Sequence, residues 1–558
     1  MYKYDEHDQT IVNERVRQFK GQTDRYLKGE LSDEEFLALR LQNGLYIQRL
    51  APMLRIAVPY GMLNSTQVRK LAELCRKYDK GYAHFTTRQN VQFNWPKLED
   101  VPSILSELAS VEMHAIQTSG NCIRNTTTDQ FAGAIADEVT DPRPYCEIIR
   151  QWSTFHPEFA FLPRKFKIAV NSVPNNDRAA TLVHDIGVQL VKDANGNVSY
   201  DIYAGGGLGR TPMVASLIRK QLPELDLLTY LEAILRVYNR YGRRDNKYKA
   251  RIKILVKAMT PEVFAAKVDE EWAHIKASSN RLTSAEISRV KAFFVDPAYE
   301  TLDNNPAELT AALANNKAFS RWYERNTDTH KKPGYRLVTL TMKKLGTPPG
   351  DVSDRQLEAI AELADQYSFG EVRVTHNQNV VLADVKQSDL FALWEKAYEQ
   401  GFATPVLGML TDIICCPGGD YCSLANAKSI PVAEQIQAKF DDLDYVYDIG
   451  ELELNISGCM NACGHHHVGH IGILGVDKKG AEFYQVSLGG SSGKIAGHTD
   501  TDIGKILGPS FARADMPEVI EKLITVYTEN RTEEELFIDT YRRIGIDPFK
   551  ERVYAPAH

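Results

Sequence analysis

Two distant segments of the chain resemble each other closely enough to indicate an internal duplication. Residues 66–93 read TQVRKLAELCRKYDKGYAHFTTRQNVQF, and residues 355–382 read RQLEAIAELADQYSFGEVRVTHNQNVVL. Both contain Ala-Glu-Leu and then Gln-Asn-Val, and the two copies stay 289 residues apart at both points. The alternative is that these are common helix and strand fragments. Because an insertion or deletion would break the constant offset, we predict that the chain folds as two related halves.

Each copy of the repeat predicts a small unit of helices and strands. Ala-Glu-Leu lies in a segment with apolar residues at helical spacing, and Gln-Asn-Val lies in a segment typical of a strand. A further strand is expected before each helix, at residues 54–61 (LRIAVPYG) and 335–342 (YRLVTLTM). Strands and helices in this order, with β-branched residues, indicate an α+β unit.

A second, weaker repeat follows each copy. HDIGVQLV (184–191) with AGGGLG (204–209) parallels GHIGILGV (469–476) with SLGGSSG (487–493), at offsets of 285 and 284 residues. We therefore predict a tandem duplication, in which each half has a small α+β unit followed by a larger α/β unit. This arrangement leaves room for a site where the halves meet.

Four cysteines in two short clusters indicate a metal centre in the second half. CCPGGDYCSLANA contains Cys416 and Cys422, and NISGCMNACGHHHVGH contains Cys459 and Cys463. Four thiolates can ligate an iron–sulfur cluster, whereas zinc sites are usually built from tighter Cys-x2-4-Cys pairs. The spacer between the first two cysteines contains a proline and two glycines, and such a wide loop suits a larger object. The spacing therefore favours an iron–sulfur cluster over structural zinc and over unligated thiols.

The composition argues against several classes of protein. A net charge of -7 argues against a nucleic-acid binder. No apolar run reaches the length of a membrane span, and the start MYKYDEHDQT lacks the apolar segment of a signal peptide. Eight cysteines in 558 residues are too few for a disulfide scaffold, and reduced thiols suit a cytoplasmic redox protein. We therefore expect a cytoplasmic protein that binds neither nucleic acid nor membrane.

The first half carries several cations on short predicted elements. They are Arg55 in PMLRIAVPYG, Arg88 in FTTRQN, Arg124 in GNCIRN, and Lys165 and Lys167 in LPRKFK. In a strand the two lysines share a face, because the side-chain period is two. Two ammonium groups on one face repel each other, so either an anion lies between them or the face is solvated. The copy of Arg88 in the second half is Asn377, so this cation belongs to one half only.

The glycine-rich segment AGGGLGR does not match a dinucleotide-binding fingerprint, because position 210 is arginine. No Walker sequence is present either. We therefore expect no nicotinamide or flavin site, so electrons for redox chemistry must arrive from another protein or subunit. The basic stretch at residues 238–257 suits either the acidic groups of a cofactor or a solvated helix face.

The Cys-x5-Cys pair, the following Gly-Cys-x3-Cys-Gly, the duplication and LPRKFK together resemble the siroheme-dependent sulfite and nitrite reductases. The resemblance covers residues 43–493 and is strongest to the haemoprotein (beta) subunits of bacterial assimilatory sulfite reductases. It implies an α+β fold with a tandem pseudo-twofold duplication, ferredoxin-like half-domains and two larger α/β siroheme/iron–sulfur domains. The implied domains are an N-terminal arm (1–52), paired ferredoxin-like half-domains (53–116 with 333–403), a first siroheme-binding domain (117–332) and an iron–sulfur/siroheme domain (404–558).

The resemblance also implies roles for the residues above. The expected ligands of a [4Fe–4S] cluster are Cys416, Cys422, Cys459 and Cys463, with Cys463 also bound to the siroheme iron. The expected substrate-facing cations are Arg55, Arg124, Lys165 and Lys167, and Arg88 is expected to contact the siroheme. One departure from the best-known bacterial pattern is the glycine-containing loop CPGGDYC, which Cys415 precedes. The spacing and the following proline favour Cys416 over Cys415 as the ligand.

The implied activity is the six-electron reduction of sulfite to sulfide in assimilatory sulfur metabolism. The alternatives are an assimilatory nitrite reductase on the same scaffold and, more remotely, a non-catalytic zinc-stabilised binding protein. Plant-type nitrite reductases tend to carry asparagine where Lys167 stands, so lysine at both 165 and 167 favours sulfite. The expected electron donor is a flavoprotein reductase subunit or a ferredoxin.

Overall fold

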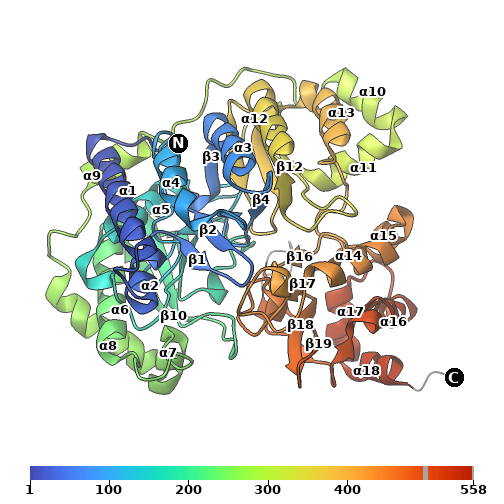
Figure 1. Ribbon diagram of the computed structural model, residues 1–558. Coiled ribbons are helices and arrows are strands. Elements are labelled where there is room, and N and C mark those ends of the chain that lie inside the picture. The colour runs from blue at the N-terminus through green and yellow to red at the C-terminus, as the bar shows by residue number, and fades with distance from the viewer. Residues whose placement is uncertain (494–499, 556–558) are drawn as a thin grey trace.

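Two copies of one small antiparallel sheet form the centre of the molecule (Figure 1). The computed structural model describes residues 1–493 and 500–555. The first sheet consists, in spatial order, of β1 (Leu45–Ile47), β2 (Pro52–Ile56), β5 (Val91–Phe93), β4 (Tyr82–Phe85) and β13 (Asp351–Ser353). The second consists of β11 (Thr327–Thr329), β12 (Tyr335–Leu340), β15 (Val380–Lys386), β14 (Glu371–Val374) and β3 (Met62–Asn64).

Each small sheet takes its last strand from the other half of the chain. Val352 of β13 lies opposite Ala83 of β4, and Leu63 of β3 lies opposite Val372 of β14. Val352 is the copy of Leu63 and Val372 is the copy of Ala83, because each lies 289 positions after its equivalent in the first half. The offset found in the sequence therefore relates the two sheets, and the exchanged strands tie the halves together.

Helices α3 (Ser65–Tyr78) and α12 (Asp354–Tyr367) pack side by side over the two sheets (Figure 1). Both begin with the same N-terminal cap. Asn64 and Gln67 exchange hydrogen bonds of 2.8 and 3.1 Å, and Ser353 and Gln356 exchange equivalent bonds of 3.2 and 3.0 Å. Such caps satisfy free N–H groups of the first turn and fix where a helix begins. The other helices of this central unit are α1 (Glu6–Leu27), α2 (Asp33–Leu41), α4 (Val101–Ala109), α10 (Ala307–Asn315), α11 (Lys317–Asn326) and α13 (Leu390–Gln400).

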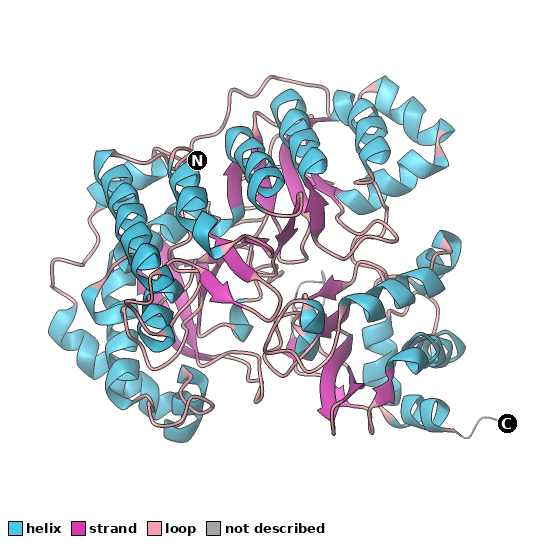
Figure 2. Ribbon diagram, in the orientation of Figure 1, coloured by secondary structure: helices cyan, strands magenta, loops and turns pink. Residues whose placement is uncertain are grey.

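Two larger sheets of equal topology flank the central unit, with helices on their outer sides (Figure 2). The first contains β6 (Thr127–Thr128), β7 (Ile168–Asn171), β8 (Ile186–Lys192), β9 (Val198–Ala204) and β10 (Ser216–Pro223). The second contains β16 (Ile414–Cys415), β17 (Leu454–Ser457), β18 (Ile471–Lys478), β19 (Ala481–Leu488), β22 (Lys505–Ile506) and β23 (Phe511–Ala512). The short strands β20 (Ser491–Ser492) and β21 (Thr501–Asp502) pair separately.

The strand directions confirm that the larger units are also copies. In each sheet the first three strands run parallel and the following ones antiparallel. Ala169 of β7 pairs with Gly187 of β8, and Asn455 of β17 pairs with Gly472 of β18. These glycines are the equivalent residues of the weaker sequence repeat. The predicted α+β fold with a tandem duplication is therefore confirmed.

Each larger unit has a hydrophobic core of its own. The helices of the first are α5 (Arg143–Ser153), α6 (Leu227–Tyr241), α7 (Ile252–Met259), α8 (Pro261–Ile275) and α9 (Ser284–Lys291). Those of the second are α14 (Ile430–Lys439), α15 (Leu443–Ile449), α16 (Met516–Asn530), α17 (Phe537–Ile544) and α18 (Asp547–Tyr554). Across the described part of the chain, no helix combines the length and the apolar character needed to span a membrane.

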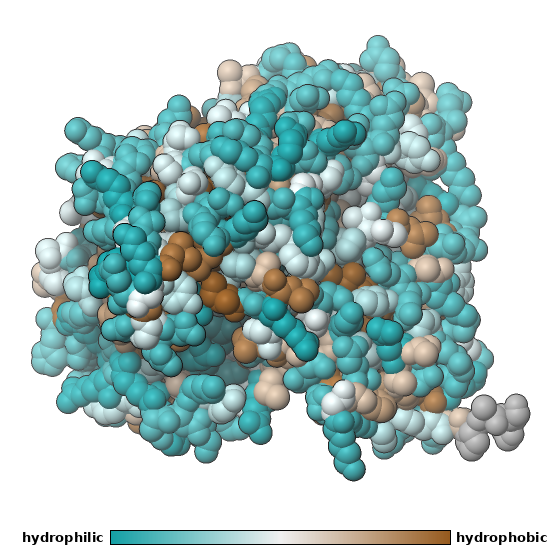
Figure 3. Space-filling model, in the orientation of Figure 1, coloured by the Kyte–Doolittle hydropathy of each residue, from teal (hydrophilic) through white to brown (hydrophobic). Residues whose placement is uncertain are grey.

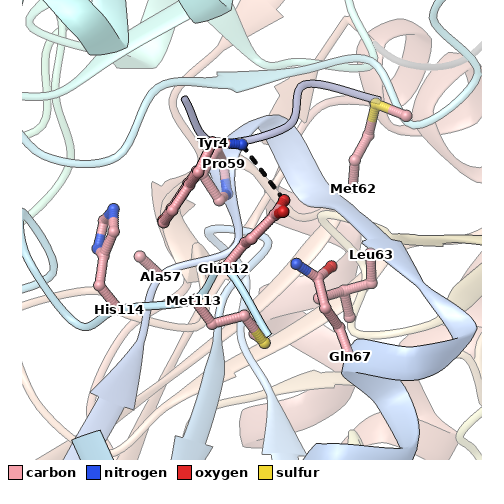
Figure 4. Close-up of a pocket in the computed structure, with 9 residues that line it drawn as sticks. All are labelled: Tyr4, Ala57, Pro59, Met62, Leu63, Gln67, Glu112, Met113 and His114. Atoms are coloured by element: carbon pink, nitrogen blue, oxygen red, sulfur yellow. Dashed lines mark hydrogen bonds between the residues drawn. The ribbon is translucent and has the colours of Figure 1, made fainter. Parts of the chain in front are cut away.

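The N-terminal segment lies against the first half and closes a small cavity (Figure 4). The amino group of Met1 donates to the carbonyl of Phe293 (3.0 Å), and the N–H of Tyr4 donates to the carboxylate of Glu112 (3.3 Å). The cavity below measures about 20 Å³. Because a single water needs roughly 10–15 Å³ on this scale, the space is too small for an organic ligand.

Candidate functional site

The side chain of Gln378 joins the central unit to the second large sheet. Its amide nitrogen donates to the carbonyls of Phe85 (3.1 Å) and Cys415 (2.9 Å), and its amide oxygen accepts the N–H of Cys415 (2.9 Å). The primary amide thus pairs with both backbone groups of Cys415 at the sheet edge. Because Cys416 follows directly, these bonds fix the start of the first cysteine loop.

Gln89 makes the equivalent bonds in the other half. Its side chain donates to the carbonyls of Thr128 (3.0 Å) and Val374 (3.1 Å) and accepts the N–H of Thr128 (3.2 Å). Gln89 and Gln378 both have left-handed backbone conformations, with φ of 57° and 62°. The repeated Gln-Asn-Val motif therefore marks two turns that attach the large sheets to the central unit.

The four predicted cluster ligands lie in two loops that follow neighbouring strands. Cys416 comes directly after β16, and Cys459 comes two residues after β17. Because β16 and β17 are parallel, their carboxyl ends open at the same edge, which is where α/β sheets usually bind ligands. The N–H of Gly458 donates to the sulfur of Cys416 (3.2 Å), so the two loops are in direct contact.

The thiols also influence one another electrostatically. Burial raises the pKa of Cys416 to about 12 and that of Cys459 to about 11, and the charge of Cys463 contributes to both shifts. Burial and Cys463 likewise raise the pKa of Cys422. All eight cysteines are free thiols. Buried thiols of this kind ionise only beside a positive charge, and a bound metal supplies one.

The charge of Cys463 thus reaches the other three predicted thiols, which places the two cysteine loops in the same region of the molecule. Within residues 1–493 and 500–555, however, no three His, Cys, Asp or Glu side chains converge as the ligands of one metal ion would.

The loop that carries Cys463 is held by the first half of the chain. The hydroxyl of Thr87 donates to the carbonyl of Cys463 (2.8 Å), and Cys463 itself is exposed. A glycine is required at the next position, because a Cβ on Gly464 would lie 1.9 Å from the carbonyl oxygen of Ile456. The first-half turn that contains Arg88 therefore lies directly against the second cysteine loop.

Three of the predicted arginines converge on the same junction. Arg124 and Arg55 both donate to the carbonyl of Thr118, at 2.7 and 3.2 Å. Arg88 donates to the carbonyl of Asn125 (2.6 Å). Burial, followed by the charge of Arg124, lowers the pKa of Arg88 to about 9. Among the described residues no carboxylate forms an ion pair with any of these three arginines, although the charge of Asp185 partly opposes the lowering of the Arg88 pKa.

Lys165 and Lys167 lie just before β7 rather than inside it. Phe166 between them is buried and forms an isolated bridge with Ile123, while both lysines are partly exposed, so the expected alternation is present. Burial lowers the pKa of Lys165 to about 8, partly opposed by the charge of Cys463. Burial, and then the charges of neighbouring cations, also lower the pKa of Lys167.

The cations of this junction greatly outnumber its carboxylates. Arg251 forms a two-point ion pair with the buried Asp185 (2.8 and 2.7 Å), whose carboxylate also accepts the N–H of Lys167 (2.8 Å). This is the one ion pair that the described residues provide for the whole group, which comprises Arg55, Arg88, Arg124, Lys165, Lys167, Arg251 and Lys253. Such an excess of partly buried positive charge favours the binding of a polyanion.

Several residues of the junction escaped the sequence analysis. Burial opposes ionisation of Tyr46, but Arg124 and Arg55 outweigh it and lower the pKa of Tyr46. The guanidinium carbon of Arg55 lies 5.3 Å from the centre of the Tyr46 ring. Tyr46 stands in no motif, so its sequence carries no signal. Arg251 and Lys253 lie in the basic stretch 238–257, whose sequence suits both the acidic groups of a cofactor and a solvated helix face.

Two family models match the chain, and each matches it twice. The model described as nitrite and sulphite reductase 4Fe-4S domain covers residues 119–276 and 409–557. The model described as nitrite/sulfite reductase ferredoxin-like half domain covers residues 48–111 and 338–400. The double matches agree with the duplication and with the predicted ferredoxin-like half-domains.

Curated relatives resemble the chain over most of its length. Sulfite reductase [ferredoxin] 1 of Mycolicibacterium paratuberculosis is 25% identical over 87% of this chain and 81% of the relative. The chloroplastic ferredoxin–nitrite reductase of Arabidopsis thaliana is 26% identical over 89% and 80%. The NirA protein of Mycobacterium tuberculosis has a solved structure of the same fold, with a TM-score of 0.76, 23% identity, and coverage of 96% of this chain and 97% of that one.

Removing the amide of Gln378 tests whether it holds the first cysteine loop. Gln378→Ala leaves the N–H and C=O of Cys415 unpaired, at a cost of about 1–3 kcal/mol for each buried group. We expect a lower melting temperature and a loss of acid-labile sulfide per purified chain.

Gln89→Ala is the matched control for Gln378→Ala. It removes the same bonds at Thr128, which no cysteine follows, so we expect a similar fall in melting temperature with nearly unchanged acid-labile sulfide. Equal loss of sulfide in the two variants would contradict a local role for Gln378.

Proposed function

We propose that this chain, which belongs to the nitrite and sulphite reductase family, reduces sulfite to sulfide. Family members carry a siroheme and a [4Fe–4S] cluster, and the family assignment brings both cofactors to this chain. It also removes the support for a zinc-stabilised binding protein. The observation that carries the choice of sulfite is the pair of lysines, Lys165 and Lys167, in a junction of unneutralised cations.

The residues present fit both cofactors. We propose that Cys416, Cys422, Cys459 and Cys463 hold the cluster and that Cys463 also reaches the siroheme iron. The eight carboxylates of a siroheme suit the excess of cations at the junction, to which Arg88 belongs. Two buried atoms there, Nε of Arg55 and Nε2 of His184, have no hydrogen-bond partner among the described residues, as expected where a polar ligand belongs.

In this proposal the chain's own cations bind the substrate and supply protons. When bound, the two cofactors deliver the six electrons that sulfite needs. Sulfite loses its three oxygens as water, so each departing oxygen needs N–H donors nearby. The guanidinium groups of Arg55 and Arg124 hold the oxyanion through their N–H donors. Lys165, with a pKa of about 8, suits proton donation near neutral pH.

An external electron donor is needed, and we propose a ferredoxin in the cytoplasm. The names of the relatives above include ferredoxin, for both sulfite and nitrite enzymes. Leu424 and Met460 flank the cysteine loops and are 67% and 40% exposed. Apolar side chains also gather across the middle of the face in Figure 3, over the junction of the three units. The free thiols suit a reducing compartment.

Steady-state assays with each anion and a chemical reductant test the proposed substrate. We expect kcat/KM for sulfite to exceed kcat/KM for nitrite, because two ammonium groups favour the more highly charged anion. A nitrite reductase is the second candidate, supported by the 26% identity to ferredoxin–nitrite reductases. Faster turnover of nitrite, expressed as kcat/KM, would favour that candidate and exclude the first.

Lys167→Asn tests the contribution of the second lysine to this preference. Removing one ammonium group weakens the attraction for sulfite more than for nitrite, so we expect the ratio of the sulfite to the nitrite kcat/KM to fall by about ten-fold, roughly the effect of 1.4 kcal/mol. Lys220→Asn, on the exposed strand β10, is a charge-matched control that leaves the ratio unchanged. An unchanged ratio in Lys167→Asn would remove Lys167 from the substrate site.

Serine replacements of two cysteines separate the proposed junction ligand from its neighbour. We expect Cys463→Ser to lose the coupled cofactors, seen as loss of visible absorption and of iron. Cys415→Ser keeps them, because the Gln378 bonds of Cys415 use only its backbone. Retention of both cofactors by the Cys463 variant would refute the proposed bridge.

A further inference from the structure

A second cavity, of about 280 Å³, lies on the other side of the pseudo-twofold arrangement. It is formed by the second small sheet, the start of β17 and loops of the first large sheet. Among the residues that line it are Thr339, Asn377, Glu451, Glu453, Arg178 and Asp328. Neither the proposed reaction nor the comparisons assign this cavity a role.

Two of these residues are the structural equivalents of arginines in the proposed reductase site. Thr339 on β12 lies opposite Val381, and Arg55 on β2 lies opposite Gln92. Because Val381 is the copy of Gln92, 289 residues later, Thr339 occupies the position of Arg55 in the second small sheet. Asn377 takes the place of an arginine in the same way, because it lies 289 residues after Arg88 in the equivalent turn. Neutral polar side chains thus replace both guanidinium groups.

Two glutamates replace the two lysines. The carbonyl of Lys167 accepts the N–H that begins β8 (3.1 Å), and the carbonyl of Glu453 accepts the N–H that begins β18 (3.0 Å). Two residues earlier stand Lys165 in one half and Glu451 in the other. The same backbone positions therefore carry opposite charges in the two cavities.

The cysteine loops also have equivalents, and they contain an ion pair. Arg178 and Cys463 each stand three residues before the short helix that precedes the third strand, η4 (Thr181–Val183) or η8 (His466–Val468). Asp129 follows β6 as Cys416 follows β16. Arg178 and Asp129 form an ion pair of 2.7 Å. This pair stands where two of the proposed cluster ligands stand in the other half.

The size of the cavity limits its ligand to a small molecule. Drug-sized ligands usually occupy about 300–1,000 Å³, so a tetrapyrrole does not fit into 280 Å³. A metal ion is also a poor fit, because no three suitable ligand side chains converge anywhere in the described ranges. A small organic molecule remains.

Two carboxylates of the cavity have no ion-pair partner among the described residues, although the guanidinium groups of Arg178 and Arg336 act on Asp328 from a greater distance. Arg178 is already paired with Asp129, and Arg325 is paired with Glu451 (3.2 Å). The carboxylates of Asp328 and Glu453 make no hydrogen bond or ion pair that the structure of residues 1–493 and 500–555 contains.

A hydroxyl without a partner among the described residues gives a second, independent sign of a ligand. Thr339 is only 2% exposed, lines the cavity, and its hydroxyl makes no hydrogen bond to a described residue. Inside the cavity only water or a ligand can bond this hydroxyl, and a bound ligand with an N–H group would satisfy it.

We propose that the second cavity binds a small organic cation with two ammonium groups, of the class of linear diamines. The carboxylates of Asp328 and Glu453 neutralise the two charges, and the hydroxyl of Thr339 accepts a further N–H. The cavity would select a cation over an anion because carboxylates stand on the backbone positions that carry cations in the other half.

Isothermal titration of the purified holoprotein with 1,4-diaminobutane tests this proposal. We expect saturable binding of the diamine and a rise in melting temperature with its concentration. We expect neither effect from 1,4-butanediol, which has the same length without charge, nor from succinate, which has the opposite charge. Absence of saturable diamine binding, or equal binding of the diol, would overturn the proposal.

Substitutions of the cavity carboxylates test whether the diamine binds in this cavity. Glu453→Gln and Asp328→Asn each remove one carboxylate from the cavity, and we expect each to weaken diamine binding at least ten-fold. Glu395→Gln removes an exposed carboxylate from α13 and leaves binding unchanged. Asp328→Asn provides the test if the Glu453 variant does not fold. Wild-type affinity in the folded cavity variants would refute this location.

Discussion

The reciprocal pairing of two glutamine side chains with two sheet edges positions everything else at the site. A primary amide has one acceptor and two donors, so Gln378 can satisfy both backbone groups of Cys415 and one carbonyl of the other half. Gln89 does the same at Thr128. Because each side chain bridges three chain segments, the large sheets cannot slide relative to the central unit without leaving buried polar groups unpaired. The bonds of Gln378 to Cys415 therefore fix where the first cysteine loop begins.

The two halves place the same backbone around the two cavities, but the side chains at equivalent positions carry opposite charges. Burial, and then the charges of neighbouring cations, lower the pKa values of Arg88, Lys165 and Lys167, so gathering these groups costs free energy unless an anionic ligand compensates. In the other half, Glu451 and Glu453 occupy the same backbone positions. A duplicated frame thus carries two groups of side chains of opposite charge, although the strands and turns that hold them are the same.

The sequence predicted those features that local pattern encodes. The constant offset of 289 residues predicted two related sheets, and their strands keep that register. It could not predict that Met62–Asn64 joins the sheet of the other half, because a three-residue strand carries no information about its partner. Likewise, Cys spacing predicted a thiol cluster, whereas Tyr46 and Asp185 gain their roles only through residues brought close by folding. The contacts of Tyr46 and Asp185 in the folded chain, and not any sequence motif, place these two residues at the junction.

The second cavity is hard to find from sequence because the residues that distinguish it differ between the two halves. A search for internal repeats rewards identity, and identity is highest where both halves need the same backbone, as in Gln-Asn-Val. The residues proposed to contact a ligand are those at which the halves differ, as Arg88 and Asn377 do. Lys167 and Glu453 fall in a stretch without detectable similarity, and only the shared hydrogen bond to the next strand identifies them as equivalents. In a duplicated protein, positions that match in structure but differ in charge are therefore the informative ones for function.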